Sequence, residues 1–407
     1  MRGSGTEVTT SRTAHGVLGL GAVGTLRRRI GQGDVGSLPI VVGLAVIWIF
    51  FQTQNSNFLT PRNLTDLLLQ MTITATVATG IVLVLLLGEI DLSVGSVVGL
   101  SSAIIGVLLV SNQVPLWLAV GVALLVALAI GCAQGAIASY VGVPTFVVTL
   151  AGMLGWLGVQ LWVLGTTGSL NVDDPAVSFL FTSYLPPALG WLAAFVVVAA
   201  YVGERVNSNR QRQRLGLSIE PWHELLVRPA LVGLVILIPV AVLNTWRGVP
   251  VAVVTMLLLV GALHLLLTET TFGRHVFAVG GNAEAARRAG ISVARIQITI
   301  FAICSLLAAI AGFMSVSRSF GASTQTGSGT LLLEAIAAGV IGGTSLFGGR
   351  GSVWSAPLGA LVMASLANGL DLTGQPPDIK YVVEMVVLLV AVTIDAMTRR
   401  SRTRSGR

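Results

Sequence analysis

Carboxylates and hydroxyls interrupt an apolar stretch early in the chain, in the run GEIDLSVGS at 88–96. A carboxylate at the centre of a bilayer costs roughly 2.5–3.5 kcal/mol, so such groups must lie near an interface, pair with a partner or face water. Two interpretations stay open. Asp91 could cap the following helix, or the segment could line the path or gate of a polar solute. The path candidates here are Glu89, Asp91, Ser93, Gly95 and Ser96.

A second interruption, rich in glycine, reads GGTSLFGGRGS at 342–352 and ends in Gly-Ser-Val, as the first one does at 95–97. Irregular backbone at membrane depth is tolerated only where protein buries it or where it lines a cavity. The break therefore either packs helices closely or extends the path, with candidates Gly343, Thr344 and Ser345. The shared ending is compatible with a diverged internal repeat.

A polar segment at 272–292, FGRHVFAVGGNAEAARRAGIS, lies between two long apolar segments. The Gly-Gly pair at 280–281 is expected to break the preceding structure, and Asn282 to cap a new helix with Glu284 in its first turn, where a carboxylate favours the helix dipole. Gly290 is expected to end that helix. At about ten residues it is too short to be stable alone and too polar to cross a bilayer, which favours a docking element.

Several kinds of enzyme chemistry are excluded by spacing. A P-loop needs Lys after its second Gly, and the only lysine, Lys380, follows Asp378 and Ile379. His223-Glu224 begins a HExxH-like run, but Val227 stands where a zinc protease needs its second His. No Ser/His/Asp set is suggested, and the two Cys lie far apart in apolar runs. No catalytic residue, metal or cofactor is predicted.

Composition sets the fold class. Hydrophobic residues make up 54% of the 407 residues, charged residues make up 10%, and the mean hydropathy is +0.86. That leaves too little polar surface for a soluble globule and predicts an all-α polytopic integral membrane protein. The net charge of +7 comes from Arg clustered in a few polar segments, which points to membrane orientation rather than nucleic-acid binding.

About 10–12 transmembrane helices are predicted, some short or broken, within a domain at 38–397. Cytoplasmic loops carry an excess of Lys and Arg. With the N-terminus inside, the basic segments 204–228 and 272–292 and the tail 398–407 are cytoplasmic, as is a Gly/Ser/Thr/Arg-rich tail at 1–37, expected to be disordered. The apolar segments lie at 38–53, 67–88, 92–111, 115–138, 143–165, 186–203, 229–244, 250–267, 293–316, 330–348, 352–370 and 379–397.

Four runs together resemble a known family: EIDLSVGSVVGLSS, GVPTFVVTLAGML, AVGGNAEAARRAGI and EAIAAGVIGGTSLFGGRGSV. They are similar to the permease subunits of bacterial ribose/xylose/arabinose-type sugar ABC importers. The polar segment 204–228, followed by an extra apolar run, looks most like the xylose branch. The resemblance implies the branched-chain/monosaccharide permease fold, a homodimer in the bacterial plasma membrane, and a monosaccharide substrate such as xylose.

The same resemblance implies partners: cytoplasmic ATPase subunits, which would use the ATP, an extracytoplasmic sugar-binding protein, and membrane lipid. It matches segment 281–290 to the family's coupling motif, through Gly281, Glu284, Ala285, Ala286 and Gly290. The fuller motif continues to Ile-x-Leu-Pro, whereas here Ile300 is followed by Phe-Ala-Ile.

An ion-coupled secondary transporter is the alternative. It would share the hydropathy and the broken helices, and would use Glu89, Asp91, Glu334 or Glu384 as proton or sodium sites. The polar helix at 281–292 favours the importer, because a secondary carrier has no need of a cytoplasmic docking element.

Overall fold

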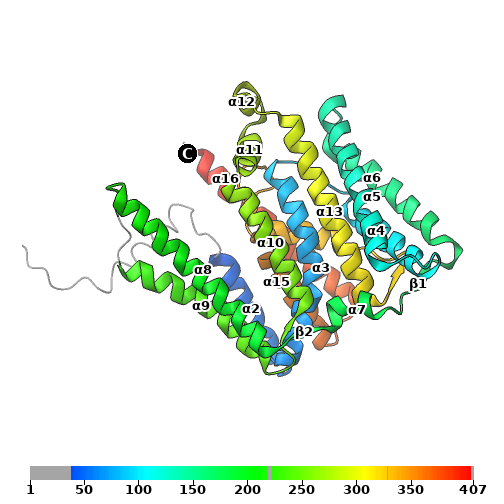
Figure 1. Cartoon of the computed structure of the whole chain (residues 1–407), viewed down its shortest axis with the longest axis horizontal. Coiled ribbons are helices and arrows are strands. Elements are labelled where there is room, and N and C mark those ends of the chain that lie inside the picture. The colour runs from blue at the N-terminus through cyan, green and yellow to red at the C-terminus, as the bar shows by residue number, and fades with distance from the viewer. Residues whose placement is uncertain (1–37, 219–221, 328, 405–407) are drawn as a thin grey trace, which may run out of the picture.

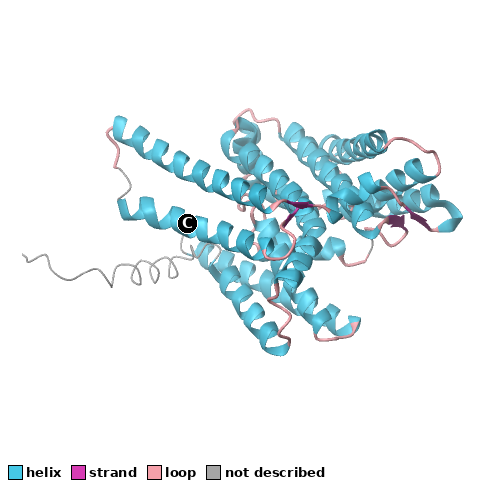
Figure 2. Ribbon diagram, turned by 60° about the horizontal axis from the view of Figure 1, so that its bottom comes forward, coloured by secondary structure: helices cyan, strands magenta, loops and turns pink. Residues whose placement is uncertain are grey.

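The protein is described by a computed structural model over residues 38–218, 222–327 and 329–404. The expected disordered tail at 1–37 lies outside the described residues. The structure is almost entirely helical (Figures 1 and 2). Its α-helices are α2 (Leu38–Gln54), α3 (Pro61–Leu86), α4 (Val94–Val110), α5 (Leu116–Ala136), α6 (Thr145–Leu164), α7 (Pro175–Thr182), α8 (Pro187–Arg214), α9 (Trp222–Asn244), α10 (Val251–Glu269), α11 (Thr271–Gly281), α12 (Ala283–Arg288), α13 (Val293–Ser319), α14 (Leu331–Ile341), α15 (Ser355–Leu372) and α16 (Pro377–Arg404).

The strands are short and join connecting segments far apart in sequence. β1 (Ser169–Asn171) pairs antiparallel with β4 (Gly321–Ser323), and β2 (Tyr184–Leu185) with β3 (Val249–Pro250). In Figure 1 these strands and α7 lie toward one end of the molecule, while α11 and α12 lie at the other end, where α16 also finishes. The two ends are thus built from different sets of connections.

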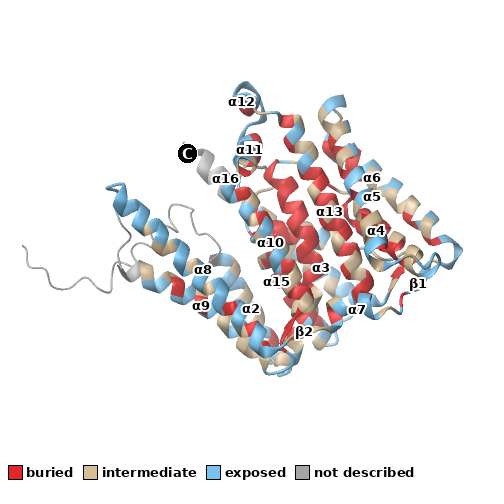
Figure 3. Ribbon diagram, in the orientation of Figure 1, coloured by how far each residue is buried: buried red, intermediate tan, exposed pale blue. Residues whose placement is uncertain are grey.

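α3 and α13 form the centre of the bundle, as the red ribbon in Figure 3 shows. The Thr60 side chain accepts a hydrogen bond from Asn63 N and so caps the start of α3. Pro61 occupies the first position of the helix, where a backbone N–H has no partner within the helix. Nearly all of its second half is buried, including its hydroxyl-bearing residues, of which Thr76 and Thr79 donate to backbone carbonyls of their own helix. Satisfying those hydroxyls locally lets a Thr-rich helix sit in the core.

The expected all-α membrane architecture is confirmed. Each of the twelve apolar segments coincides with one of the helices α2 to α6, α8 to α10 and α13 to α16. Among the described residues, seven helices are long and apolar enough to cross a membrane, and α2, α4 and α14 are shorter apolar helices. α14 has only 11 residues and ends at the Gly-rich break, well short of the expected span 330–348.

Two expected boundaries differ in the structure. Residues 204–214 belong to α8 and 222–228 to α9, so the segment 204–228 is mostly helix around a short connection. α16 likewise continues through most of the basic tail, to Arg404. Long polar side chains are good helix formers, so a helix can continue past the end of its apolar part.

Candidate coupling and translocation site

The two sequence breaks and the end of α11 meet at one point. Gly349 N donates to Leu86 O at the end of α3 (2.8 Å), and a Cβ built on Gly348 would lie 2.8 Å from both Gly88 N and Gly280 O. A Cβ on Gly280 would lie 1.8 Å from Leu86 O. Only residues without side chains allow backbones this close, and we call this contact the glycine junction.

The glycine junction adds a packing role to the Gly-Gly pair. Gly280 and Gly281 are the last two residues of α11, so the preceding helix ends at this pair, as expected, and Asn282 starts the next one. Gly280 is required by close packing, whereas a Cβ on Gly281 would meet nothing within 4 Å. Gly280 therefore ties the end of α11 to the membrane helices.

The short helix α12 has the expected start and end. The Asn282 side chain accepts from Ala285 N (2.9 Å), so it caps the helix. Glu284, in the first turn, pairs with Arg287 and Arg288, each at 3.1 Å. Gly290 ends the turn with φ +85°, a left-handed conformation that disfavours side chains.

α12 touches the rest of the protein through one face. Ala286 is buried and contributes to the apolar core, whereas Glu284, Ala285 and Gly290 are exposed. The two ion pairs are also exposed, so each contributes only about 0.3–0.5 kcal/mol. Most of the surface of α12 is available to a partner.

Asp91 lies in a buried polar cluster between α3 and α4. Its Oδ1 accepts from Ser93 N (2.9 Å) and Ser93 Oγ (2.7 Å), and Ser93 Oγ lies 3.0 Å from Gln134 Oε1 on α5. Burial raises the pKa of the Asp91 carboxyl, and the hydrogen bonds from Ser93 act in the opposite direction. Asp91 holds the turn before α4, but the N-cap of α4 is Ser93.

The same cluster leaves polar atoms without a hydrogen-bond partner in the described part of the chain: Gln134 Nε2, Trp156 Nε1 and Asp91 Oδ2, although the Cys304 thiol neighbours the Asp91 carboxyl. A Cβ on Gly152 would lie 2.2 Å from Gln134 Nε2 and 3.2 Å from Trp156 Nε1, so the two donors converge over this residue. An unpaired buried polar group costs about 1–3 kcal/mol. Convergent unpaired donors and acceptors are suited to bind hydroxyls.

Glu89 belongs to a second, half-buried polar cluster. It accepts hydrogen bonds from Thr145 at the start of α6 and from Gln297 on α13 (3.1 Å), and Ser139 donates to the Gln297 amide (2.9 Å). These bonds hold α6 and α13 to the connection between α3 and α4. Glu89 is thus partnered in this structure and is not an open ion site.

The remaining predicted path residues fall into two groups. Ser96 donates to Met153 O on α6 (2.8 Å), and a Cβ on Gly95 would lie 2.6 Å from Gly327 O, so this pair packs against α6 and the loop before α14. Thr344 is buried with an unpartnered hydroxyl, Ser345 Oγ accepts from Phe347 N, and the surroundings of Gly343 are open. The glycine junction joins the two breaks, but the predicted hydroxyls do not form a single cluster.

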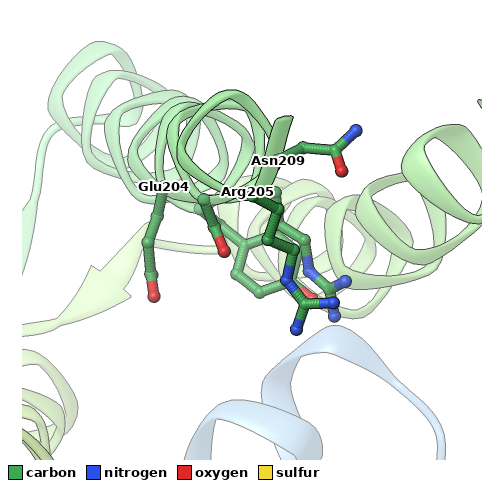
Figure 4. A pocket seen from close by; sticks show the side chains of 6 residues that line it. Glu204, Arg205 and Asn209 are labelled. Carbon is green, nitrogen blue, oxygen red and sulfur yellow. The ribbon is translucent and has the colours of Figure 1, made fainter. Parts of the chain in front are cut away.

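A hollow of ≈ 280 Å³ on α8 contains none of the predicted residues. It is lined by one face of that helix, where Arg205 stacks on Tyr201 with 5.7 Å between guanidinium carbon and ring centroid (Figure 4). Among the described residues, no group of three or more His, Cys, Asp or Glu could hold a metal ion.

The sequence family described as "Branched-chain amino acid transport system / permease component" matches residues 63–392. The chain belongs to this permease family. It is 39% identical over 357 residues to the xylose transport system permease protein XylH of Escherichia coli, covering 88% of this chain and 90% of the relative. It is 35% identical over 364 residues to XylH of Haemophilus influenzae, covering 89% and 96%. It is 33% identical over 356 residues to the ribose import permease protein RbsC of E. coli, covering 87% and 92%. No solved structure matches.

The family match and the apolar helices together show that the permease is a multi-pass inner-membrane protein. Inspection of the sequence missed several of its polar core residues, namely Gln134, Gln160 and Gln297. Gln134 and Gln160 are buried, and each is a lone amide in an apolar helix. A polar residue inside a membrane helix is a functional hypothesis by default, so that isolation was the available signal.

Proposed function

We propose that this permease is the membrane subunit of an importer for a monosaccharide, xylose in particular, driven by separate ATPase subunits. The choice of xylose as the substrate is based on the 39% identity to xylose permeases over nearly the whole chain, compared with 33% identity to a ribose permease. The convergent unpaired polar atoms around Asp91 support a solute rich in hydroxyls. Selectivity resides in an extracytoplasmic binding protein that delivers the sugar.

α12 is the contact for the ATPase. Its exposed surface and its capped, Gly-terminated ends give a rigid element that a groove could grip. Through the adjacent end of α11, the glycine junction connects this element to the end of α3 and to the Gly-rich break that follows α14. Movement of α12 is therefore passed directly to both breaks, which gives a route for coupling.

A second copy of the chain completes the path. Several helices expose large apolar side chains along their length, among them α6 and α16, and the single chain buries little of α6. Part of that apolar surface contacts lipid, and part is covered in a homodimer. Both termini lie in the cytoplasm, on the side of α12 and of the Arg-rich end of α8.

The test is uptake of labelled D-xylose into vesicles that contain this permease with its ATPase and binding protein. We expect accumulation that requires both partners and ATP, with D-ribose and D-arabinose as comparisons. Permease alone should not accumulate sugar when a proton or sodium gradient is imposed. Gradient-driven accumulation would establish the secondary transporter instead and refute the importer.

A further inference from the structure

A cavity of ≈ 330 Å³ lies where α3 begins and α13 ends. This end of the molecule also carries α7 and is opposite α12 (Figure 1). Its volume is at the lower end of the roughly 300–1,000 Å³ typical of ligand pockets, so it fits a small ligand. The cavity is lined by Asp66 and Gln70 of α3, Phe181 and Thr182 of α7, and Arg318 and Phe320 at the end of α13.

The lining combines rings with polar groups. Asp66 and Gln70 make no side-chain hydrogen bond or ion pair with another described residue, and Arg318 interacts electrostatically with Glu334 on α14 without a direct ion pair. Such side chains are costly against lipid, so they face water or a ligand. A carboxylate accepts hydrogen bonds from hydroxyls, a guanidinium donates them and an amide does both. The rings of Phe181 and Phe320 can pack against an apolar C–H face of a ligand.

The polar lining continues inward along α3. Asp66, Gln70 and Thr74 follow at intervals of four residues and so share one face of the helix. Thr74 Oγ1 lies 3.5 Å from Glu334 Oε2, in the first turn of α14. α14 is about 16 Å long and ends at the Gly-rich break. Polar side chains thus extend from the cavity as far as Thr74 and Glu334.

Phe320 is held in an unfavourable backbone conformation. Its φ is +53°, left-handed, and its side chain is 51% exposed at the C-cap of α13. Gly or Asn would satisfy this position without strain, and a bulky residue there is a genuine outlier. An exposed ring kept at a strained cap points to a use for the ring itself.

We infer that this cavity receives the monosaccharide on the extracytoplasmic side, with Phe320 against the sugar face and Asp66, Gln70 and Arg318 on its hydroxyls. The inference rests on the proposed function. Once the binding protein releases the sugar, the cavity would hold it before it moves along α3.

Two substitutions of Phe320 separate the ring from the backbone. Phe320→Gly removes the ring and relieves the strain, whereas Phe320→Tyr keeps both. Gln113→Gly is the matched control, because Gln113 also has φ +53° but does not line the cavity. Each is measured as D-xylose uptake by the full importer, with the binding protein titrated.

We expect Phe320→Gly to lower the maximal uptake rate by about three- to tenfold, the effect of losing one aromatic contact. The half-saturating concentration of binding protein should not change, since docking precedes sugar release. Phe320→Tyr and Gln113→Gly should match wild type. Wild-type turnover in Phe320→Gly, or a change only in half-saturation, would overturn the inference.

Failure of the proposed function is distinguishable from failure of this site. If wild type transports no pentose, the proposed function is wrong whatever the variants do. Saturation-transfer NMR with D-xylose and the purified permease then tests the cavity directly. We expect transfer from aromatic protons in wild type that is weakened in Phe320→Gly and in Asp66→Asn. Equal transfer in all three proteins would also overturn the inference.

Discussion

Replacing Gly280 by Ala tests the glycine junction. The added Cβ would lie 1.8 Å from Leu86 O and 2.8 Å from Gly349 N, and real Cβ contacts are not found below 3.0 Å. α11 must therefore retreat from α3 by more than an ångström, and no flexible side chain can absorb that movement. Overpacking of this kind costs about 1–3 kcal/mol, and weakening the Gly349–Leu86 hydrogen bond adds about 0.5–1.5 kcal/mol.

Gly281→Ala is the matched control. It adds the same methyl group to the next residue of the same helix, where nothing lies within 4 Å. Relative to Gly, Ala favours a helix by about 0.5–1 kcal/mol, and both variants receive this contribution. The two should therefore differ by about 1.5–4.5 kcal/mol, with Gly280→Ala the less stable.

The assay compares melting temperatures of the purified permease with uptake per molecule in vesicles. Gly280→Ala should melt below wild type and transport poorly for its abundance, because the end of α11, which leads into α12, is no longer held to the end of α3 and to the Gly-rich break. Gly281→Ala should melt at or slightly above wild type and transport normally. Indistinguishable melting and uptake for the two variants would show that the backbones are not in close contact and would refute the reasoning.

Three further predictions concern the polar cluster, the ATPase contact and the topology. Ser93→Ala should lower stability by about 1–3 kcal/mol, because it removes the single hydroxyl donor that Asp91 Oδ1 and Gln134 Oε1 share. Ser102→Ala should cost less, because the Ser102 hydroxyl bonds only to Gly99 O within its own helix; thermal melting compares the two variants. Asn and Asp both tolerate the left-handed turn at Gly290, so Gly290→Asn and Gly290→Asp differ mainly in charge. We expect the Asp variant alone to lose co-purification with the ATPase, because it places a charge in the interface. Equal retention of the ATPase by both variants would argue against docking at this helix. The topology is tested by single cysteines in a background without Cys132 and Cys304. Asn209→Cys should be shielded from an impermeant thiol reagent added outside cells, and Ser169→Cys should react with it. Labelling of Asn209→Cys from outside would contradict the cytoplasmic placement of the end of α8.

The sequence by itself determined the fold class, the positions of the apolar helices and the ends of α12. These features depend on local physics. Membrane helices need long apolar runs, since each must satisfy its backbone in lipid, and a cap needs only Asn282 and Gly290 at the right spacing. The coupling and path roles of the named residues remain predictions.

The tertiary structure alone decided which polar residues meet. Sequence could not show that Gly280 rather than Gly281 touches Leu86, that Gln297 reaches Glu89 from 208 residues away, or that Phe320 and Asp66 line the same cavity. These contacts depend on how helices distant in sequence pack, and packing depends on the shapes of many side chains at once. A pattern within one helix carries no record of its neighbours, so the glycine junction and the cavity appear only when the chain is folded.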